Sequence, residues 1–166
     1  MDIIWQELTS GLPNSTQLKH VILRLIAATL LGAVVGVQRQ RAHKPAGLRT
    51  HILVSLGTTV LILTCSGVGM SMDALARIIQ GIATGIGFIG AGSILKLSHE
   101  HQIQGLTTAA GVWMTAAIGV AVGLGSLGIA LLATFFTLIV LTLAWHHEKW
   151  TEKKAAADAA NNNPQI

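Results

Sequence analysis

Residues 106–145 read LTTAAGVWMTAAIGVAVGLGSLGIALLATFFTLIVLTLAW, and these 40 residues contain no Asp, Glu, Lys or Arg. A helix needs about 20 apolar residues to cross the hydrocarbon core of a bilayer. This stretch is therefore long enough for two crossings, and it predicts spans over 106–124 and 126–145.

Three further apolar stretches precede it, over 21–37, 52–70 and 77–95. The whole chain is 51% hydrophobic and only 11% charged, whereas soluble domains carry roughly a quarter charged residues. We therefore predict an all-α integral membrane protein, a bundle of five transmembrane helices in contact with the lipid bilayer.

The two ends of the chain differ from this membrane domain, which we expect over residues 21–145. Residues 1–20 place Ile3 and Ile4 before a Gly-Leu-Pro-Asn break, which is typical of a short helix lying on the outer interface. Residues 146–166 end in Asn-Asn-Asn-Pro-Gln-Ile and predict a cytoplasmic tail, a helical extension that frays into disorder.

Basic residues indicate the orientation, because Lys and Arg gather on the cytoplasmic side of membrane proteins. Eight of them fall on one side of the predicted spans and three on the other. This predicts an amino terminus outside and a carboxyl terminus in the cytoplasm, in agreement with an odd number of spans. The eight are Arg39, Arg41, Lys44, Arg49, Lys96, Lys149, Lys153 and Lys154, and the three are Lys19, Arg24 and Arg77.

Several classes of function lack their characteristic residues. The formal charge of +4 is accompanied by only three Phe, four Trp and no Tyr, which is too few stacking aromatics for a nucleic-acid face. The chain has no phosphate-binding Gly-Lys loop, no Gly-x-Ser-x-Gly and no His-Glu-x-x-His motif, so we expect neither enzyme chemistry nor a cofactor. Cys65 is expected to be a small buried hydrophobe, and His99 with His101 is too small a set for a metal site.

A magnesium path would lack its usual ligands. Mg²⁺ prefers carboxylate oxygens, and none of the seven acidic residues falls within a predicted span. A path would have to use backbone carbonyls, hydroxyls such as those of Thr107 and Thr108, or a partner subunit. The seven are Asp2, Glu7, Asp73, Glu100, Glu148, Glu152 and Asp158.

Glycines recur four residues apart, a spacing that lets membrane helices approach closely. The pairs Gly32 and Gly36, Gly81 and Gly85, and Gly119 and Gly123 predict a compact bundle. The run Gly85-Ile86-Gly87-Phe88-Ile89-Gly90-Ala91-Gly92 is denser, and each glycine costs a helix up to about 1 kcal/mol relative to alanine. We interpret this run as a broken helix that exposes backbone groups to a cavity; a tightly packed straight helix is the alternative.

An internal repeat relates the spans. Arg24 stands eight residues before Gly32, as Arg77 stands eight before Gly85. The segment Gly47-Leu48-Arg49-Thr50 precedes the second span as Gly105-Leu106-Thr107-Thr108 precedes the fourth. This pattern predicts a parallel duplication of spans 1–2 and 3–4, with span 5 added.

Three arginines near the spans are candidates for function, because ionisable groups close to lipid are costly. Arg24 is expected to snorkel, with its guanidinium in water. Asp73 lies one turn before Arg77, and we expect this pair to fix the start of the third span. Arg49 belongs to a polar cluster with His51 at the start of the second span, which could hold a phosphate or carboxylate; positive-inside anchoring is the alternative.

Taken together, these segments resemble the MgtC/SapB family of bacterial membrane proteins. The resemblance covers residues 24–125 in order, and several motifs together are far more specific than one glycine run. The matching segments are Arg24-Leu25, Leu31-Gly32, Gly36, Arg39, Pro45 to His51, Asp73 with Arg77, Gly85 to Gly92, and Gly105 to Ala110 with Trp113.

The resemblance implies a bacterial inner-membrane protein with five spans, associated with growth under magnesium limitation and, in some members, with virulence or acid survival. Two residues depart from the family pattern: Gln38 stands where the family usually has Glu, and Asp73 lacks the usual following Pro. The soluble domain of longer members is missing, so the short chain looks closer to the SapB branch. The site residues it implies are Arg39, Gly47, Arg49, Thr50, His51, Asp73, Arg77, Gly85, Gly87, Phe88, Gly90, Gly92, Gly105, Thr107, Thr108 and Trp113.

Two functional hypotheses follow. The first is a regulatory protein that docks other membrane proteins, or a second copy of itself, through its glycine faces and basic inner loop. The second is a component of a transporter or channel for magnesium or another ion that acts as an oligomer, with the broken third span and residues 105–109 lining the path. A water-filled cavity beside residues 85–92 would favour transport, and a solid bundle with an exposed small-residue stripe would favour docking.

Overall fold

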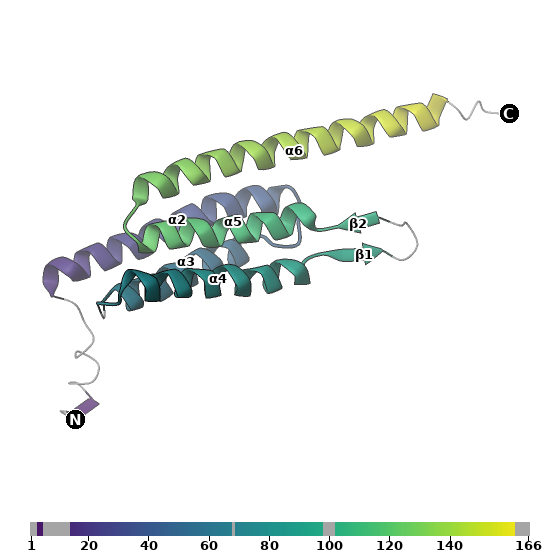
Figure 1. Cartoon of the computed structure of the whole chain (residues 1–166). Coiled ribbons are helices and arrows are strands. Elements are labelled where there is room, and N and C mark those ends of the chain that lie inside the picture. Colours follow the sequence, from purple (N-terminus) through teal and green to yellow (C-terminus); the bar gives the residue numbers. More distant parts are fainter. Residues whose placement is uncertain (1–2, 5–13, 68, 98–101, 162–166) are drawn as a thin grey trace.

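In the computed structural model, which describes residues 3–4, 14–67, 69–97 and 102–161, the chain forms a bundle of five long helices (Figure 1). All five are long and apolar enough to cross a membrane, as the sequence predicts. They are α2 (Ser15–Arg41), α3 (Leu48–Gly67), α4 (Met72–Gly92), α5 (Leu106–Gly123) and α6 (Leu127–Asn161).

The first and last helices run past the predicted spans. α2 begins at Ser15, inside the predicted interfacial segment, whose residues 5–13 lie outside the described part of the chain. α6 continues to Asn161, so most of the predicted tail is helical. Figure 1 places the start of α2 at one end of the bundle and the end of α6 at the other. Which end faces the cytoplasm stays a prediction.

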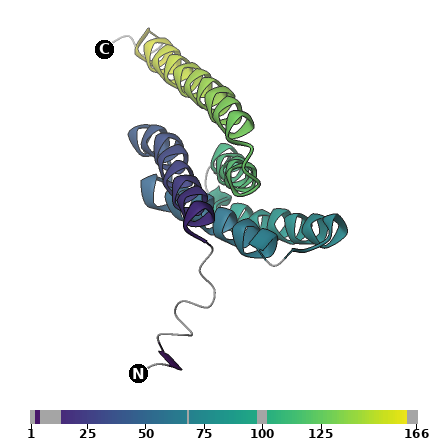
Figure 2. The same cartoon turned by 90° about the vertical axis from the view of Figure 1, so that its left-hand side faces the viewer.

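The centre of the bundle is α5, which contacts α2, α3, α4 and α6. Figures 1 and 2 show α6 on one side of it and α4 on the opposite side. Nine of the 18 residues of α5 are buried, whereas only two of the 21 residues of α4 are. The interior of the protein is therefore formed mainly by α2, α3 and α5, while α4 is a peripheral helix.

Glycines bring these three helices together, as their spacing predicts. A Cβ atom at Gly32 would lie 2.7 Å from the backbone oxygen of His51. Further along α3, a Cβ at Gly123 would lie 2.7 Å from Ile62 Cβ. Hydrogen at these positions lets helix backbones approach and gain dispersion contacts that lipid cannot offer.

The prediction of a broken third span is wrong. α4 is a continuous helix through Gly92, with Gly90 among its buried residues. The tight-packing alternative also fails for most of the run, because a Cβ at Gly85, Gly87 or Gly92 would meet no atom within 4 Å. Only Gly90 is packed, at 3.5 Å from Ala109 Cβ. The helix remains continuous because it satisfies its backbone hydrogen bonds internally. In lipid this advantage outweighs the low helix propensity of glycine.

A small hairpin not expected from the sequence joins α4 to α5. β1 (Leu95–Leu97) pairs antiparallel with β2 (Gln102–Gln104). Gly105 then turns the chain into α5 with φ of 95°, and a Cβ there would overlap the backbone of Ser93. Only glycine adopts this conformation without strain, so Gly105 has a structural role at this turn.

The predicted duplication stays a prediction. Its best-matched glycines, however, have different surroundings. Gly32 packs against α3, whereas a Cβ at Gly85 would meet nothing within 4 Å.

Candidate functional site

The buried face of α3 is polar. His51, Ser55, Thr58 and Thr59 are each at most 4% exposed, while Leu53 on the other side of the helix is 67% exposed. In lipid, a helix turns its apolar side chains outward and satisfies its polar groups against protein. The four polar side chains therefore point into the bundle, toward α2 and α5.

Arg39 joins α2 to α5 at one end of this face. Its side chain is only 2% exposed, and Nη2 donates a hydrogen bond of 2.8 Å to Oγ1 of Thr108, which is 1% exposed. A hydrogen bond from a charged donor is worth about 1.5–3 kcal/mol. Arg39 is thus a buried, positioned cation and not a solvated anchor.

His51 lies next to this pair and is fully buried. Its Nδ1 is 2.7 Å from Thr115 Oγ1, and that hydroxyl donates its own proton to the carbonyl of Gly111 at 2.9 Å. The Thr115 hydroxyl therefore links the His51 ring to the backbone of α5. Within the described part of the chain, His51 Nε2 and Ser55 Oγ are both buried and meet no hydrogen-bond partner.

The polar residues continue toward the opposite end. Thr59 donates to the carbonyl of Gly119 at 2.8 Å, and Arg24 Nη1 donates to the carbonyl of Gly123 at 2.9 Å. Fifteen residues separate Arg24 from Arg39 on α2, which is about 22 Å along a helix. We call this set the polar interior; it comprises Arg24, Arg39, His51, Ser55, Thr58, Thr59, Thr108 and Thr115.

The polar interior is closely packed. A Cβ at Gly119 would overlap Thr58 Oγ1 and the backbone oxygen of Ser55, and one at Gly36 would lie 2.7 Å from Leu48 Cα. Such contacts leave no room for a side chain larger than hydrogen. The interior therefore consists of interlocked helices joined by hydrogen bonds.

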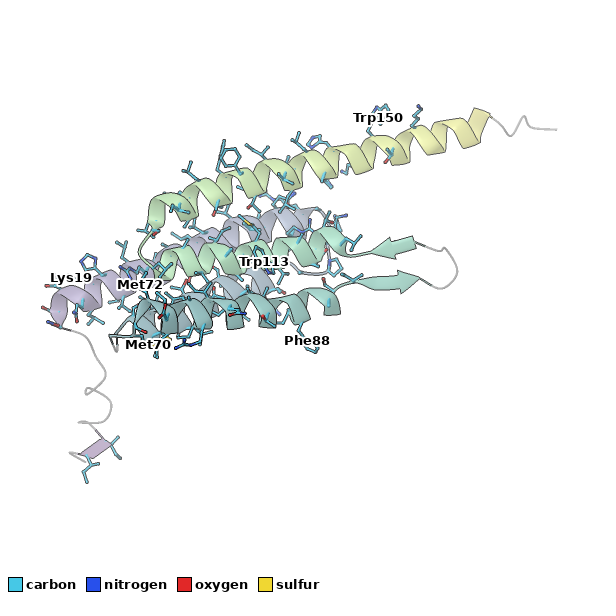
Figure 3. All side chains as sticks on the ribbon, viewed as in Figure 1. Lys19, Met70, Met72, Phe88, Trp113 and Trp150 are labelled. Carbon is cyan, nitrogen blue, oxygen red and sulfur yellow. The ribbon has the colours of Figure 1, made fainter. Side chains whose placement is uncertain are left out.

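The outward face of α4 is different. A Cβ at Gly81 or Gly85 would meet nothing within 4 Å, and Phe88 is 84% exposed and points away from the bundle (Figure 3). Beside these residues an apolar groove of about 930 Å³ runs between α3 and α4, bordered by Leu53 and Ile89 among others. We call Gly81, Gly85, Phe88 and Ile89 the α4 face.

The sixteen site residues that the resemblance implies do not form one site, and they differ in burial. Only Arg39, His51 and Thr108 meet in the polar interior; Gly90 is buried against α5, and Gly47, Thr50 and Gly105 are half-buried. The remaining nine are exposed: Arg49, Asp73, Arg77, Gly85, Gly87, Phe88, Gly92, Thr107 and Trp113.

Two expectations about charged residues need correction. Within the described residues, no ion pair joins Asp73 to Arg77, and both side chains are exposed; the start of α4 is capped instead by Ser71, which accepts from the backbone N–H of Ala74. Asp73 stands in the first turn of α4, where a carboxylate stabilises the helix dipole. Arg24, expected to hold its guanidinium in water, is half-buried, and its guanidinium caps the carboxyl end of α5.

The predicted polar cluster at the start of α3 is divided. Arg49 is exposed and His51 is fully buried, so these two side chains do not converge on one ligand. Nothing in the geometry connects Arg49 to the polar interior.

Sequence reasoning missed Ser55, Thr58, Thr59 and Thr115. A signal was present, because His51, Ser55 and Thr59 recur every four residues within an apolar stretch, a spacing that places them on one helix face. Among the described residues, no group of three or more His, Cys, Asp and Glu comes together where it could hold a metal ion.

Comparison with known proteins gives a consistent result. A family model described as the MgtC family matches residues 25–150. Protein SrpB of Synechococcus elongatus is 41% identical over 145 residues, covering 76% of this chain and 80% of that protein. No solved structure matches.

Two enterobacterial proteins are also similar. Protein MgtC of Salmonella typhimurium is 47% identical over 117 residues, covering 70% of this chain and 49% of that protein. The putative magnesium transporter YhiD of Escherichia coli is 41% identical over 127 residues, covering 72% of this chain and 58% of that protein. The chain thus spans most of SrpB, about half of MgtC and less than two thirds of YhiD.

Proposed function

This chain is a multi-pass membrane protein of the MgtC family, and on that premise we propose that it acts in the bacterial inner membrane by docking another membrane protein on its α4 face. Its action is binding and not catalysis, and it serves growth under low magnesium or acid stress.

The observation that carries the proposal is the α4 face itself. Gly81 and Gly85 stand four residues apart on a helix with only two buried residues, and neither is used for packing within the chain. Glycine gains nothing from contact with lipid, but it lets the backbone of a second helix approach closely. Phe88, 84% exposed on the same helix, offers apolar area for such a contact.

The packed interior supports docking over conduction. The glycines between α2, α3 and α5 hold the helix backbones in direct contact, and the groove beside α4 has an apolar lining on the surface of the bundle. An ion crossing the membrane needs oxygen ligands or water along its path. The polar interior would have to separate before an ion could pass.

Ion transport is the second candidate, and the polar interior is the observation that favours it. Buried hydroxyls and one imidazole follow α3 through the bundle, and Ser55 Oγ and His51 Nε2 have no partner. The relative YhiD is named a putative magnesium transporter. An opened state of this region would offer ligands of the kind a cation path requires.

The decisive experiment compares two glycines that both have open surroundings. Gly85→Leu adds a side chain to the α4 face, and Gly128→Leu adds the same side chain to α6, where a Cβ also meets nothing within 4 Å. Each variant is tested for growth in low magnesium in a bacterium lacking its own family members, and for magnesium flux into liposomes with an enclosed magnesium-sensitive dye.

We expect Gly85→Leu to abolish growth and Gly128→Leu to retain it, with no flux from wild-type protein. Equal growth of the two variants would contradict docking on the α4 face. Flux from wild-type protein that Thr115→Val reduces would favour transport through the polar interior.

A further inference from the structure

A groove between α2 and α6 has a composition that differs along its length. It encloses about 620 Å³, and its walls are Leu30, Ala33, Val34, Val37 and Leu138. At one end it reaches Gln38, Arg41, Thr142 and Trp145. The groove is thus apolar over most of its length and polar, with a cation, at one end.

The charge at the polar end comes from both helices. Arg41 is the last residue of α2 and is exposed. On α6, the ammonium group of Lys149 lies 4.1 Å from the centre of the Trp145 ring, so a cation–π contact holds it near the groove. Among the side chains that the structure describes, no carboxylate lines the groove.

The groove has the length of one lipid leaflet. Eleven residues separate Leu30 from Arg41 on α2, which is about 16 Å of helix, and a leaflet contributes about half of a 30 Å hydrocarbon core. α2 and α6 contact each other, and beyond Leu30 both Ala28 on α2 and Ala130 on α6 are fully buried. The residues that line the groove on α2 begin at Leu30, near mid-membrane, and reach the interface at Arg41.

From these observations we propose that the groove between α2 and α6 binds one anionic phospholipid of the adjacent leaflet. An acyl chain lies along Val34, Val37 and Leu138, and the phosphodiester group contacts Arg41 and Lys149. The predicted orientation makes this the cytoplasmic leaflet. Basic pockets between transmembrane helices on that side bind anionic head groups by the same combination of charge and apolar wall.

A partner helix fits this groove less well. A transmembrane helix crosses both leaflets, whereas the residues that line the groove on α2 cover only Leu30 to Arg41, about the depth of one leaflet. The inference is independent of docking on the α4 face, which lies on the opposite side of the bundle (Figure 2).

Native mass spectrometry tests the proposal on the full chain. The protein is released from vesicles of equal parts phosphatidylglycerol and phosphatidylcholine, and retained lipids are identified by mass. We expect one phosphatidylglycerol per chain. Arg41→Gln should weaken its retention about fivefold, since a cation near an anionic lipid is worth about 1 kcal/mol. Ala33→Phe, which fills the groove, should abolish it.

Matched controls separate the groove from general charge and bulk. Arg49→Gln removes an exposed arginine from the same end of the bundle, outside the groove, and Ala110→Phe adds the same bulk to an exposed position on α5. Both should retain phosphatidylglycerol as wild type does. Equal retention of the two lipids would overturn the proposal, and so would equal loss of phosphatidylglycerol in Arg41→Gln and Arg49→Gln. A lipid-free dimer that Ala33→Phe abolishes would also overturn it, because the groove would then bind a second copy of the chain.

A fluorescence measurement covers the case in which a variant fails to fold. The difference between wild type and Trp145→Phe isolates the emission of Trp145. Brominated phosphatidylglycerol should quench this emission several-fold more efficiently than brominated phosphatidylcholine at equal content. Equal quenching by both lipids would contradict an anionic site beside Trp145.

Discussion

The glycines of α4 and those of α2 and α5 share the same spacing but have opposite surroundings. At Gly119 a Cβ would overlap the side chain and backbone of α3, whereas at Gly85 it would meet open space. Both glycines stand four residues from another glycine on a helix that crosses the membrane. Small residues four positions apart therefore show that another helix can approach closely. Which helix does so depends on the neighbours that the fold provides.

A second contrast runs parallel to the first. Between α2, α3 and α5, hydrogen-bonded polar side chains are buried among apolar ones, while within the described residues the glycines of the α4 face meet no neighbour. The interior is therefore specified by this chain alone, and the outer face is available to another. Matched substitutions in the two regions test this distinction.

The largest effect is expected for Gly119→Leu. The new side chain must displace Thr58 and the α3 backbone, and overpacking of this kind costs about 3 kcal/mol or more. We expect loss of the folded bundle, measured by thermal unfolding in detergent. Gly85→Leu is the matched control and should change stability by less than about 1 kcal/mol. A comparable loss in both would show that the two glycine sets do not differ as described.

Thr108→Val should have the next largest effect. It removes the acceptor of Arg39 Nη2 and leaves part of a buried guanidinium without that bond, at a cost of about 2 kcal/mol. The neighbouring Thr107 is exposed, so Thr107→Val should be neutral. Denaturant titration of both variants checks the difference, and equal midpoints would contradict a structural bond between Arg39 and Thr108.

Thr115→Val is expected to cost about 1 kcal/mol, because it removes the hydroxyl partner of the buried His51 Nδ1 and hydrogen bonds between membrane helices are individually modest. Thr64→Val is its counterpart on the exposed side of α3. The chemical shift of the His51 ring should change in the first variant alone. An unchanged shift in Thr115→Val would contradict the contact between His51 and Thr115.

The smallest effect is expected for Gly85→Ala. A methyl group there meets no atom within 4 Å, and alanine favours a helix over glycine by up to about 1 kcal/mol. Unfolding should shift slightly toward higher stability. Gly36→Ala, which would place Cβ 2.7 Å from Leu48 Cα, should shift it in the opposite direction. If both variants shift the stability in the same direction, the glycines of α2 and α4 do not differ in their packing.

Hydropathy predicts the five spans because helices in lipid must bury every backbone hydrogen bond within an apolar segment. Hydropathy does not predict the polar interior, since a few threonines and one histidine hardly change the mean hydropathy of such a segment. Arg24 illustrates the difficulty. Its position near a helix end suggests a solvated side chain, but its partner, the carbonyl of Gly123, lies 99 residues away in the chain.

The glycine run of α4 marks the other limit. Four glycines within eight residues suggest a break, and the sequence carries no information on whether neighbours press against them. The start of the same helix is fixed by Ser71, which caps it, and not by the exposed charges of Asp73 and Arg77. Local patterns predict which segments cross the membrane, and contacts distant in sequence decide which faces meet.

The central position of α5 has a consequence for biosynthesis. The bonds from Arg39, His51 and Thr59 all end on α5, at sequence separations of 69, 64 and 60 residues. At a synthesis rate of 5–20 residues per second, α3 waits about 3 to 13 s for its partner. During that interval its polar face has no counterpart in the nascent chain. We therefore expect the insertion machinery to release α2 and α3 only after α5 has emerged. A chain truncated before α5 should be degraded by membrane proteases.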